Sequence, residues 1–145
     1  MELNHLSQNG ECVIVICDSD LQRWFDDNEV LACSAMITAW SANEASIERL
    51  DKLVRTFLEK GCKFFVCAGS HAESLHDSID DIILMYNDTY LDVVTSYHVN
   101  EEAQDVIDFF LSSIAIKDKK NSKFIAVLDV NKKENRELED ALMKA

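Results

Sequence analysis

The chain has 145 residues, of which 48% are hydrophobic, and this is enough apolar material for one sizeable core. Its formal net charge of −13, from 27 acidic and 14 basic residues, argues against nucleic acid and anionic membranes as partners, because both select a basic surface. The first residues, MELNH, lack the basic and apolar regions of a signal peptide, and no apolar run reaches the roughly 18 residues that span a bilayer. We therefore expect a cytoplasmic protein.

Near-continuous apolar runs predict strands that are buried on both faces of a sheet. Three such runs are residues 12–17 (CVIVIC), 62–68 (CKFFVCA) and 123–130 (KFIAVLDV). Residues 92–99 (DVVTSYHV) predict a more polar strand. In residues 30–40 (VLACSAMITAW) the Val, Ile, Thr and Trp favour a strand, although the three alanines leave a helix open.

Helix starts are predicted after these runs. Ser19, Ser41 and Ser70 each precede Gln or Glu by three residues, as in a capping box, and Asn131 is a weaker version. Asn100, followed by two glutamates, is predicted as a plain N-cap. Stripes of apolar residues at helical spacing follow, and Gly61 is predicted to end one helix. The stripes are Leu21, Trp24 and Phe25; Ile47, Leu50, Val54, Phe57 and Leu58; Leu75, Ile79, Ile82, Ile83 and Tyr86; Ala103, Val106, Ile107, Phe110 and Ile114; and Leu138, Ala141 and Leu142.

This alternation of strands and helices predicts a single α/β domain over residues 1–145. We expect a three-layer sandwich in which helices flank a mostly parallel sheet of about five strands. The arrangement is flavodoxin-like or Rossmann-like, and the sequence does not reveal the strand order.

The five cysteines are predicted to be reduced and buried. Cys12 and Cys17 are five residues apart on one predicted strand, as are Cys62 and Cys67, so the members of each pair should face opposite sides of the sheet. No Cys-x-x-Cys zinc motif is present. We predict neither a bound metal nor a cofactor, and free thiols fit a cytoplasmic location.

An acidic segment is the strongest functional indication. Between Lys63 and Lys117 there is no lysine or arginine. Like charges repel, so a surface of one sign is favoured where it meets a basic partner, although plain solubility remains the alternative. If right-handed crossovers place two predicted acidic helices side by side, their charges form one patch. The predicted partner-binding residues are Glu73, Asp77, Asp80, Asp81, Asp88, Asp92, Glu101, Glu102, Asp105 and Asp108.

A second candidate site is the rim formed by the carboxyl ends of the strands, where ligands bind in open parallel sheets. Two histidines and three aspartates on this rim could hold a divalent metal, but their spacing matches no metal motif. The rim also loosely resembles a phosphoreceiver domain, yet residues 67–69 (CAG) stand where an acceptor aspartate is expected. The rim residues are Asp18, Asp20, His71, His98 and Asp129.

We therefore predict a non-enzymatic protein that binds and neutralises a basic protein. Bacterial immunity proteins and antitoxins directed against cationic nucleases have this profile of size and charge, but no motif assigns the chain to a family. The mechanism would be electrostatic steering followed by occlusion of the basic groove. The alternative is a small metal- or ligand-dependent α/β enzyme, or a degenerate receiver-like regulatory module, that uses the strand-end rim.

Overall fold

The computed structural model describes residues 2–6, 12–28, 32–38, 44–86, 88–113, 122–128 and 133–144. The strands within these ranges are β1 (Glu2–Leu6), β2 (Cys12–Ile16), β3 (Ala32–Thr38), β4 (Cys62–Ala68), β5 (Val94–His98) and β6 (Ser122–Val127). The helices are α1 (Asp18–Asp27), α2 (Glu44–Glu59), α3 (Ala72–Tyr86), the short 3₁₀ helix η1 (Asp88–Tyr90), α4 (Ala103–Ser112) and α5 (Lys133–Lys144). None of the described helices is both long and apolar enough to cross a membrane.

The described strands form one sheet in the order β1-β2-β6-β3-β4-β5. All neighbouring strands are parallel except β1, which pairs with β2 in the antiparallel direction. The predicted α/β class and mostly parallel sheet are confirmed, and residues 32–38 are a strand. The strand order matches neither the flavodoxin nor the Rossmann arrangement, because β6 lies between β2 and β3.

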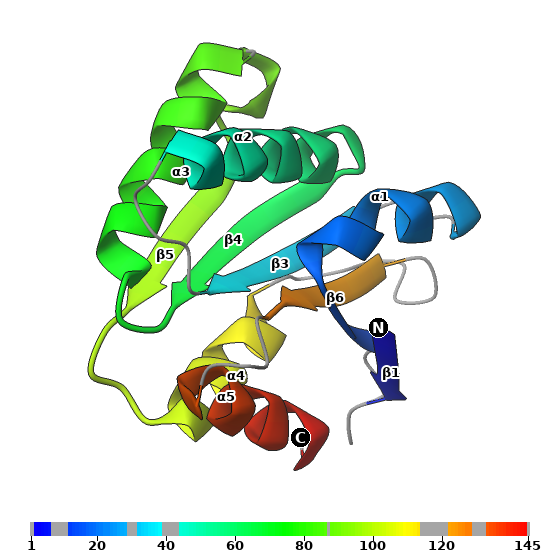
Figure 1. The fold of residues 1–145 in the computed structure, drawn as a ribbon, viewed down its shortest axis with the longest axis vertical. Coiled ribbons are helices and arrows are strands. Elements are labelled where there is room, and N and C mark those ends of the chain that lie inside the picture. The colour runs from blue at the N-terminus through cyan, green and yellow to red at the C-terminus, as the bar shows by residue number, and fades with distance from the viewer. Residues whose placement is uncertain are drawn as a thin grey trace.

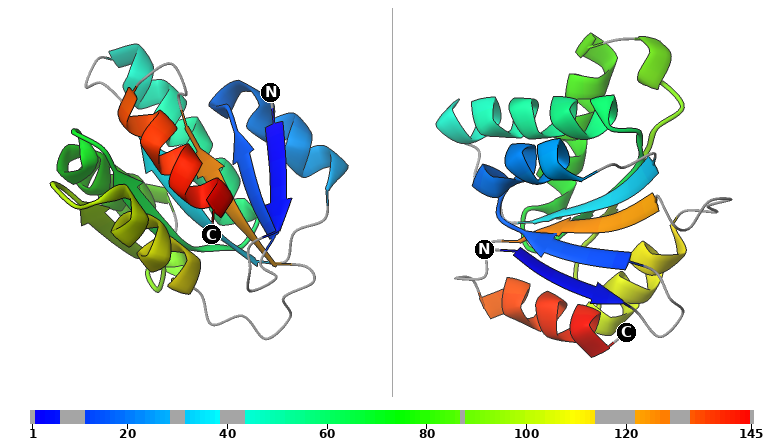
Figure 2. Two further views of the ribbon diagram at one scale, coloured as in Figure 1. Left: turned by 90° about the horizontal axis from the view of Figure 1, so that it is seen from below. Right: turned by 90° about the vertical axis from the view of Figure 1, so that its right-hand side faces the viewer.

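In the described part of the chain, helices α1, α2 and α3 cover one face of the sheet, and α4 and α5 cover the other (Figures 1 and 2). Helices α1, α2 and α3 share one buried cluster with the sheet, whereas α4 and α5 share a second cluster on the opposite face. The right-handed crossover explains this division. The connections from β2 through β5 all progress in one direction across the sheet, whereas the connection from β5 to β6 returns in the other direction and places α4 on the opposite face.

Several predicted helix starts are wrong by one or two residues. Helix α1 begins at Asp18 with Cys17 as its N-cap, so Ser19 already lies inside the helix. The backbone N–H of Leu75 donates to the carbonyl of His71 at 3.0 Å, which makes His71 the N-cap of α3 in place of Ser70. Asn100 is not the N-cap of α4; Glu102 is, without a side-chain hydrogen bond. The capping boxes of Ser41 and Asn131 lie outside the described residues.

Two backbone features at the start of β4 are also informative. Gly61 has φ of 84° and ends α2, as predicted. Immediately afterwards a β-bulge leaves Lys63 unpaired, since Cys33 pairs with Cys62 and the next residue, Ser34, pairs with Phe64. The extra residue turns Cys62 to the same face as Cys67, so the prediction that these two cysteines face opposite sides is wrong.

The cores on the two faces otherwise follow the predicted stripes. Phe57 and Phe65 meet edge to face under α2, and Phe110 and Phe124 do so under α4. Ile47 departs from its predicted stripe, because its side chain is 54% exposed at the amino-terminal part of α2. The described free thiols are half-buried at Cys17 and buried at Cys33, Cys62 and Cys67; the side chain of Cys12 lies outside the described residues.

Candidate functional site

The expectation that the two acidic helices lie side by side is wrong. Helix α3 covers one face of the sheet and α4 the other, so their acidic rows are separated by the thickness of the sheet (Figure 2). The reason is the return of the chain from β5 to β6, which places α4 on the second face. The two rows instead flank strand β5, which is the last strand at one edge of the sheet.

Half of the predicted acidic residues already have partners within the chain. His76 lies 3.0 Å from Asp77 and 3.6 Å from Asp80, which also accepts a hydrogen bond from the hydroxyl of Thr95. The others with partners are Asp92 (Lys63, 4.0 Å), Glu101 (His98, 2.9 Å) and Asp108 (Gln104, 2.9 Å). Within the described part of the chain, no ion pair or side-chain hydrogen bond engages Glu73, Asp81, Asp88, Glu102 or Asp105.

Large apolar side chains are exposed between and beside these acids. Met85 is 84% exposed and Leu84 63% exposed at the carboxyl end of α3, and Val94 of β5 is 48% exposed. We define the β5-edge surface as strand β5 together with the exposed apolar residues around it. These residues are Leu84, Met85, Leu91, Val94, Tyr97, Val99 and Phe109. An open edge strand with exposed apolar residues, and without the lysine or proline that usually protects such an edge, is typical of an interaction surface.

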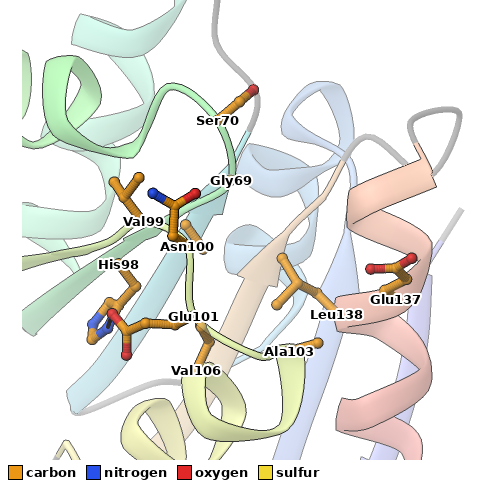
Figure 3. Close-up of a pocket in the computed structure, with 11 residues that line it drawn as sticks. Gly69, Ser70, His98, Val99, Asn100, Glu101, Ala103, Val106, Glu137 and Leu138 are labelled. Carbon is orange, nitrogen blue, oxygen red and sulfur yellow. Dashed lines mark hydrogen bonds and ion pairs between the residues drawn. The ribbon is translucent and has the colours of Figure 1, made fainter.

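A pocket of about 220 Å³ lies at the carboxyl ends of β4 and β5 (Figure 3). After β4 the chain turns to α3 on one face, whereas after β5 it turns to α4 on the other. The two connections diverge here, so this is a topological switch point, the place where open parallel sheets bind ligands. The pocket is lined by Ala68, Gly69, Ser70, His98, Val99, Asn100, Glu101, Ala103, Val106, Glu137 and Leu138.

Two tight turns shape the mouth of this pocket. Gly69 has φ of 92°, a conformation that glycine adopts without steric cost, and it directly follows β4. Asn100 has φ of 59°, within the left-handed region that asparagine tolerates better than most residues. The turn at Asn100 separates β5 from α4, and this explains why the helix begins at Ala103, after the position that the sequence suggested.

Of the predicted rim residues that the structure describes, His98 alone lines the pocket, and a chain of hydrogen bonds orients it. Its Nδ1 lies 2.9 Å from Oε2 of Glu101, and its Nε2 lies 3.2 Å from the hydroxyl of Ser96. An ionised carboxylate only accepts, so the Nδ1–H of His98 donates to Glu101, and Nε2 makes the contact with the hydroxyl of Ser96. The ring also packs against Phe109, with 4.5 Å between centroids, and its side chain is 8% exposed.

The order hydroxyl, imidazole, carboxylate is that of a nucleophilic triad, but the described geometry does not complete such a site. Ser96 lies within β5 and is not among the residues that line the pocket. A triad needs its serine beside the substrate and donors for the oxyanion. We therefore interpret the chain of contacts as a device that fixes the orientation of His98 at the edge of the pocket.

The other predicted rim residues do not join His98. Asp20 forms an ion pair with Arg23 at 3.0 Å on α1, and His71 is exposed and does not line the pocket. The side chain of Asp18 and all of Asp129 lie outside the described residues. Among the residues that the structure places, no group of three or more His, Cys, Asp or Glu side chains is arranged to hold a metal ion.

Some pocket residues were missed because the sequence does not show where α5 lies. Glu137 and Leu138 come from that helix, and only the placement of β6 in the middle of the sheet brings them beside β4 and β5. Glu101 was assigned to the acidic surface only. Its spacing of three residues from His98 is the one local signal that could have indicated the contact between them.

Comparison with known proteins identifies a family but no activity. A family model described as "Domain of unknown function (DUF7684)" matches residues 15–145. The chain belongs to this family. The matched region contains β5, both flanking helices and every residue that lines the pocket, whereas β1 lies outside it. No curated protein matches the chain.

Proposed function

We propose that this DUF7684 protein binds a basic protein through the β5-edge surface and thereby neutralises it. The observation that carries this proposal concerns the described residues: β5 has a neighbouring strand on one side only, apolar side chains around it are exposed, and acids on both flanking helices have no side-chain partner. Each part has a separate role in association. The acids attract and orient a basic partner, the apolar residues supply buried area, and the strand edge offers backbone hydrogen bonds.

The charge distribution favours a basic occupant over a neutral one. Apart from the histidines, Lys63 is the one basic residue that pairs with a predicted partner-binding acid among the described residues, and its distance of 4.0 Å from Asp92 makes this a weak surface contact. A basic surface placed along β5 would neutralise the negative charge of the acids on both α3 and α4. Complementary fields of this kind raise association rates and suppress binding of acidic proteins.

A cationic nuclease is the partner class that fits this surface best. Such an enzyme needs a basic groove for nucleic acid, and an acidic protein placed in that groove excludes the phosphate backbone. The protein would then act as an immunity protein or antitoxin, with no catalysis of its own. The net charge of −13 supports this role, because it gives the same sign of field as the competing nucleic acid.

The test uses charge reversal at acids that have no side-chain partner among the residues the structure describes. Asp81→Lys with Asp105→Lys alters one acid on each side of β5 and leaves the contacts of Asp80 and Glu101 intact. The matched control is Asp27→Lys with Glu48→Lys, which changes the net charge equally on the exposed surface of α1 and α2. We would capture partners at about 0.15 M salt, identify and purify the retained protein, and measure association with each variant.

We expect the captured protein to be basic, to form a defined complex and to lose its nuclease activity in that complex. The double reversal at α3 and α4 should slow association at least tenfold and flatten its salt dependence, whereas the control should behave as the wild-type protein. Equal effects of the two double variants would assign the binding to net charge alone and would contradict the proposal. Full nuclease activity in a saturated complex would contradict the neutralising role.

A further inference from the structure

We propose that the pocket between β4 and β5 receives an arginine side chain of the basic partner, an inference that rests on the proposed function. The pocket adjoins the β5-edge surface, because Val99 belongs to both and Glu101 of the predicted acidic set lines it. A partner that binds along β5 therefore lies next to the mouth of the pocket. Specific interfaces commonly place one anchoring side chain in such a hollow, and arginine is frequent among these anchors.

The charges in the pocket select a cation. Glu101 lies at the β5–α4 turn and Glu137 on α5, so two carboxylates come from different walls (Figure 3). None of the described residues that line it is a lysine or an arginine. A pocket at the carboxyl ends of strands and near helix starts ordinarily attracts anions, because backbone N–H groups point toward it. Here both carboxylates oppose an anion, and the charge of Glu102 further offsets the dipole at the start of α4.

The size and the walls favour a long cationic side chain over a compact ion. The volume of about 220 Å³ is below the roughly 300–1,000 Å³ typical of pockets for drug-sized ligands, so it suits a single side chain. Val99, Ala103 and Leu138 provide apolar walls for a methylene stem. A stem buried along apolar walls with a charged head between carboxylates is the way arginine and lysine are accommodated.

The acceptors around the head favour the guanidinium of arginine over the ammonium of lysine. Only Oε2 of Glu101 is engaged by His98, which leaves its other carboxylate oxygen open to a ligand. Glu137 and the amide oxygen of Asn100 add acceptors on different sides. A guanidinium presents five N–H donors in a planar fork and can satisfy several such acceptors at once, whereas an ammonium has three.

The experiment uses a small arginine analogue as the probe. Nα-acetyl-arginine methylamide would be titrated into the full-length protein while the backbone amides of Gly69 and Asn100 are followed by NMR. Two comparison ligands would be titrated in the same way. The corresponding citrulline derivative is nearly isosteric but uncharged, and inorganic phosphate is an anion. Glu137→Gln removes one pocket carboxylate, and Asp140→Asn removes one exposed carboxylate from the same helix without touching the pocket.

We expect saturable shifts at Gly69 and Asn100 with the arginine analogue, at least fivefold weaker binding in Glu137→Gln and unchanged binding in Asp140→Asn. Citrulline and phosphate should give no saturable shift there. Equal binding of citrulline, tighter binding of phosphate, or equal losses in the two variants would overturn the assignment. The absence of any saturable shift at the pocket would overturn it as well.

Failure of this inference and failure of the proposed function give different results. A purified partner that binds the wild-type protein and Glu137→Gln equally well would leave the β5-edge proposal standing and remove the pocket from it. Saturable binding of the arginine analogue without any basic protein partner would do the reverse. That result would support a pocket that binds cations and would contradict the proposed neutralising function.

Discussion

At the scale of single residues, the buried thiols have an energetic consequence that depends on pH. Burial, with the nearby charge of Asp80, raises the pKa of Cys67 from 9.0 to about 12. The neighbouring thiol of Cys62, together with burial, raises the pKa of Cys33 well above its usual range. Both thiols therefore stay protonated in the folded protein at pH values where the unfolded chain has lost those protons.

The sign of the effect on stability follows from proton linkage. Between pH 9 and about 12 the folded state holds more protons than the unfolded state, so stability falls as the pH rises. We expect Cys67 to contribute a decline of about 1.4 kcal/mol per pH unit in the free energy of unfolding. Urea unfolding under reducing conditions at pH 8, 9 and 10 would measure it.

The matched variants separate titration from packing. Cys67→Ala should make the decline with pH shallower by about that amount, whereas Val66→Ala, on the same strand and equally buried, should lower stability at every pH and keep the slope. An unchanged slope in Cys67→Ala would show that this thiol titrates alike in both states.

Individual contacts were the least predictable features from sequence. The stop at Gly61 was predictable, since a left-handed residue after a helix selects glycine. The orientation of Cys62 was not, because one bulged residue at Lys63 reverses the alternation and no local pattern announces it. The contact of His98 with Glu101 depends on the turn at Asn100, which the sequence presented as a helix cap.

At the scale of elements, β5 differs from the other parallel strands. It is short, its pattern mixes exposed and half-buried residues, and one of its edges has no described neighbour. The sequence indicated this difference, because residues 92–99 were the most polar of the predicted strands. Edge position, however, is a property of the sheet and could not be assigned before the order of strands was known.

A lysine on this strand tests its role. Val94→Lys places a charge where the side chain is already 48% exposed, so stability should change by no more than about 0.5 kcal/mol. Binding of the purified basic partner should weaken at least tenfold, because an edge lysine hinders strand addition and repels a basic surface. Calorimetric titration would give the affinity, and urea unfolding would give the stability.

Ile47→Lys is the control for this substitution, since Ile47 is similarly exposed but lies on α2, away from the edge. It should retain the wild-type affinity. Equal weakening in both variants would show that any added positive charge disfavours the complex, and β5 would lose its special role.

Strand β1 illustrates an element that was missed although a signal was present. Asn9–Gly10 is the dipeptide most typical of a tight hairpin, and it stands between β1 and β2. The flanking segment at residues 2–6 is too short and too polar to predict a strand alone. Its antiparallel pairing with β2 became evident only in the structure.

At the scale of the whole molecule, the net charge of −13 should make stability sensitive to salt. Repulsion among acids on α3, α4 and the intervening loop opposes folding and is screened as the Debye length falls from about 30 Å at 0.01 M to about 8 Å at 0.15 M. We expect the midpoint of thermal unfolding to rise by about 2–6 °C over this range of NaCl. Differential scanning calorimetry would measure the change.

The variant Asp81→Lys with Asp105→Lys should reduce this rise, because it lowers the net charge and adds attractive pairs on the two helices. A midpoint that is constant or falls with added NaCl would mean that the acids do not destabilise the folded state. The acidic surface would then carry no stability cost for a partner to offset.

The α/β class could be predicted at this scale, and the relative placement of helices could not. Apolar runs and periodic stripes determine which segments form strands and helices. The side of the sheet that a helix covers depends on the direction of the following crossover, and the direction taken after β5 is a property of strand order alone. The predicted merging of acids on α3 and α4 failed for this reason.

The central position of β6 also determines when the protein can fold during its synthesis. Strands β2 and β3 have no ladder between them and are joined only through residues 122–127. The unit from β3 to β5 can assemble as it leaves the ribosome, because its strands pair with sequence neighbours. The inner edges of β2 and β3 must instead wait until residues 122–127 have been synthesised, so nascent chains expose two apolar strand edges that chaperones can recognise.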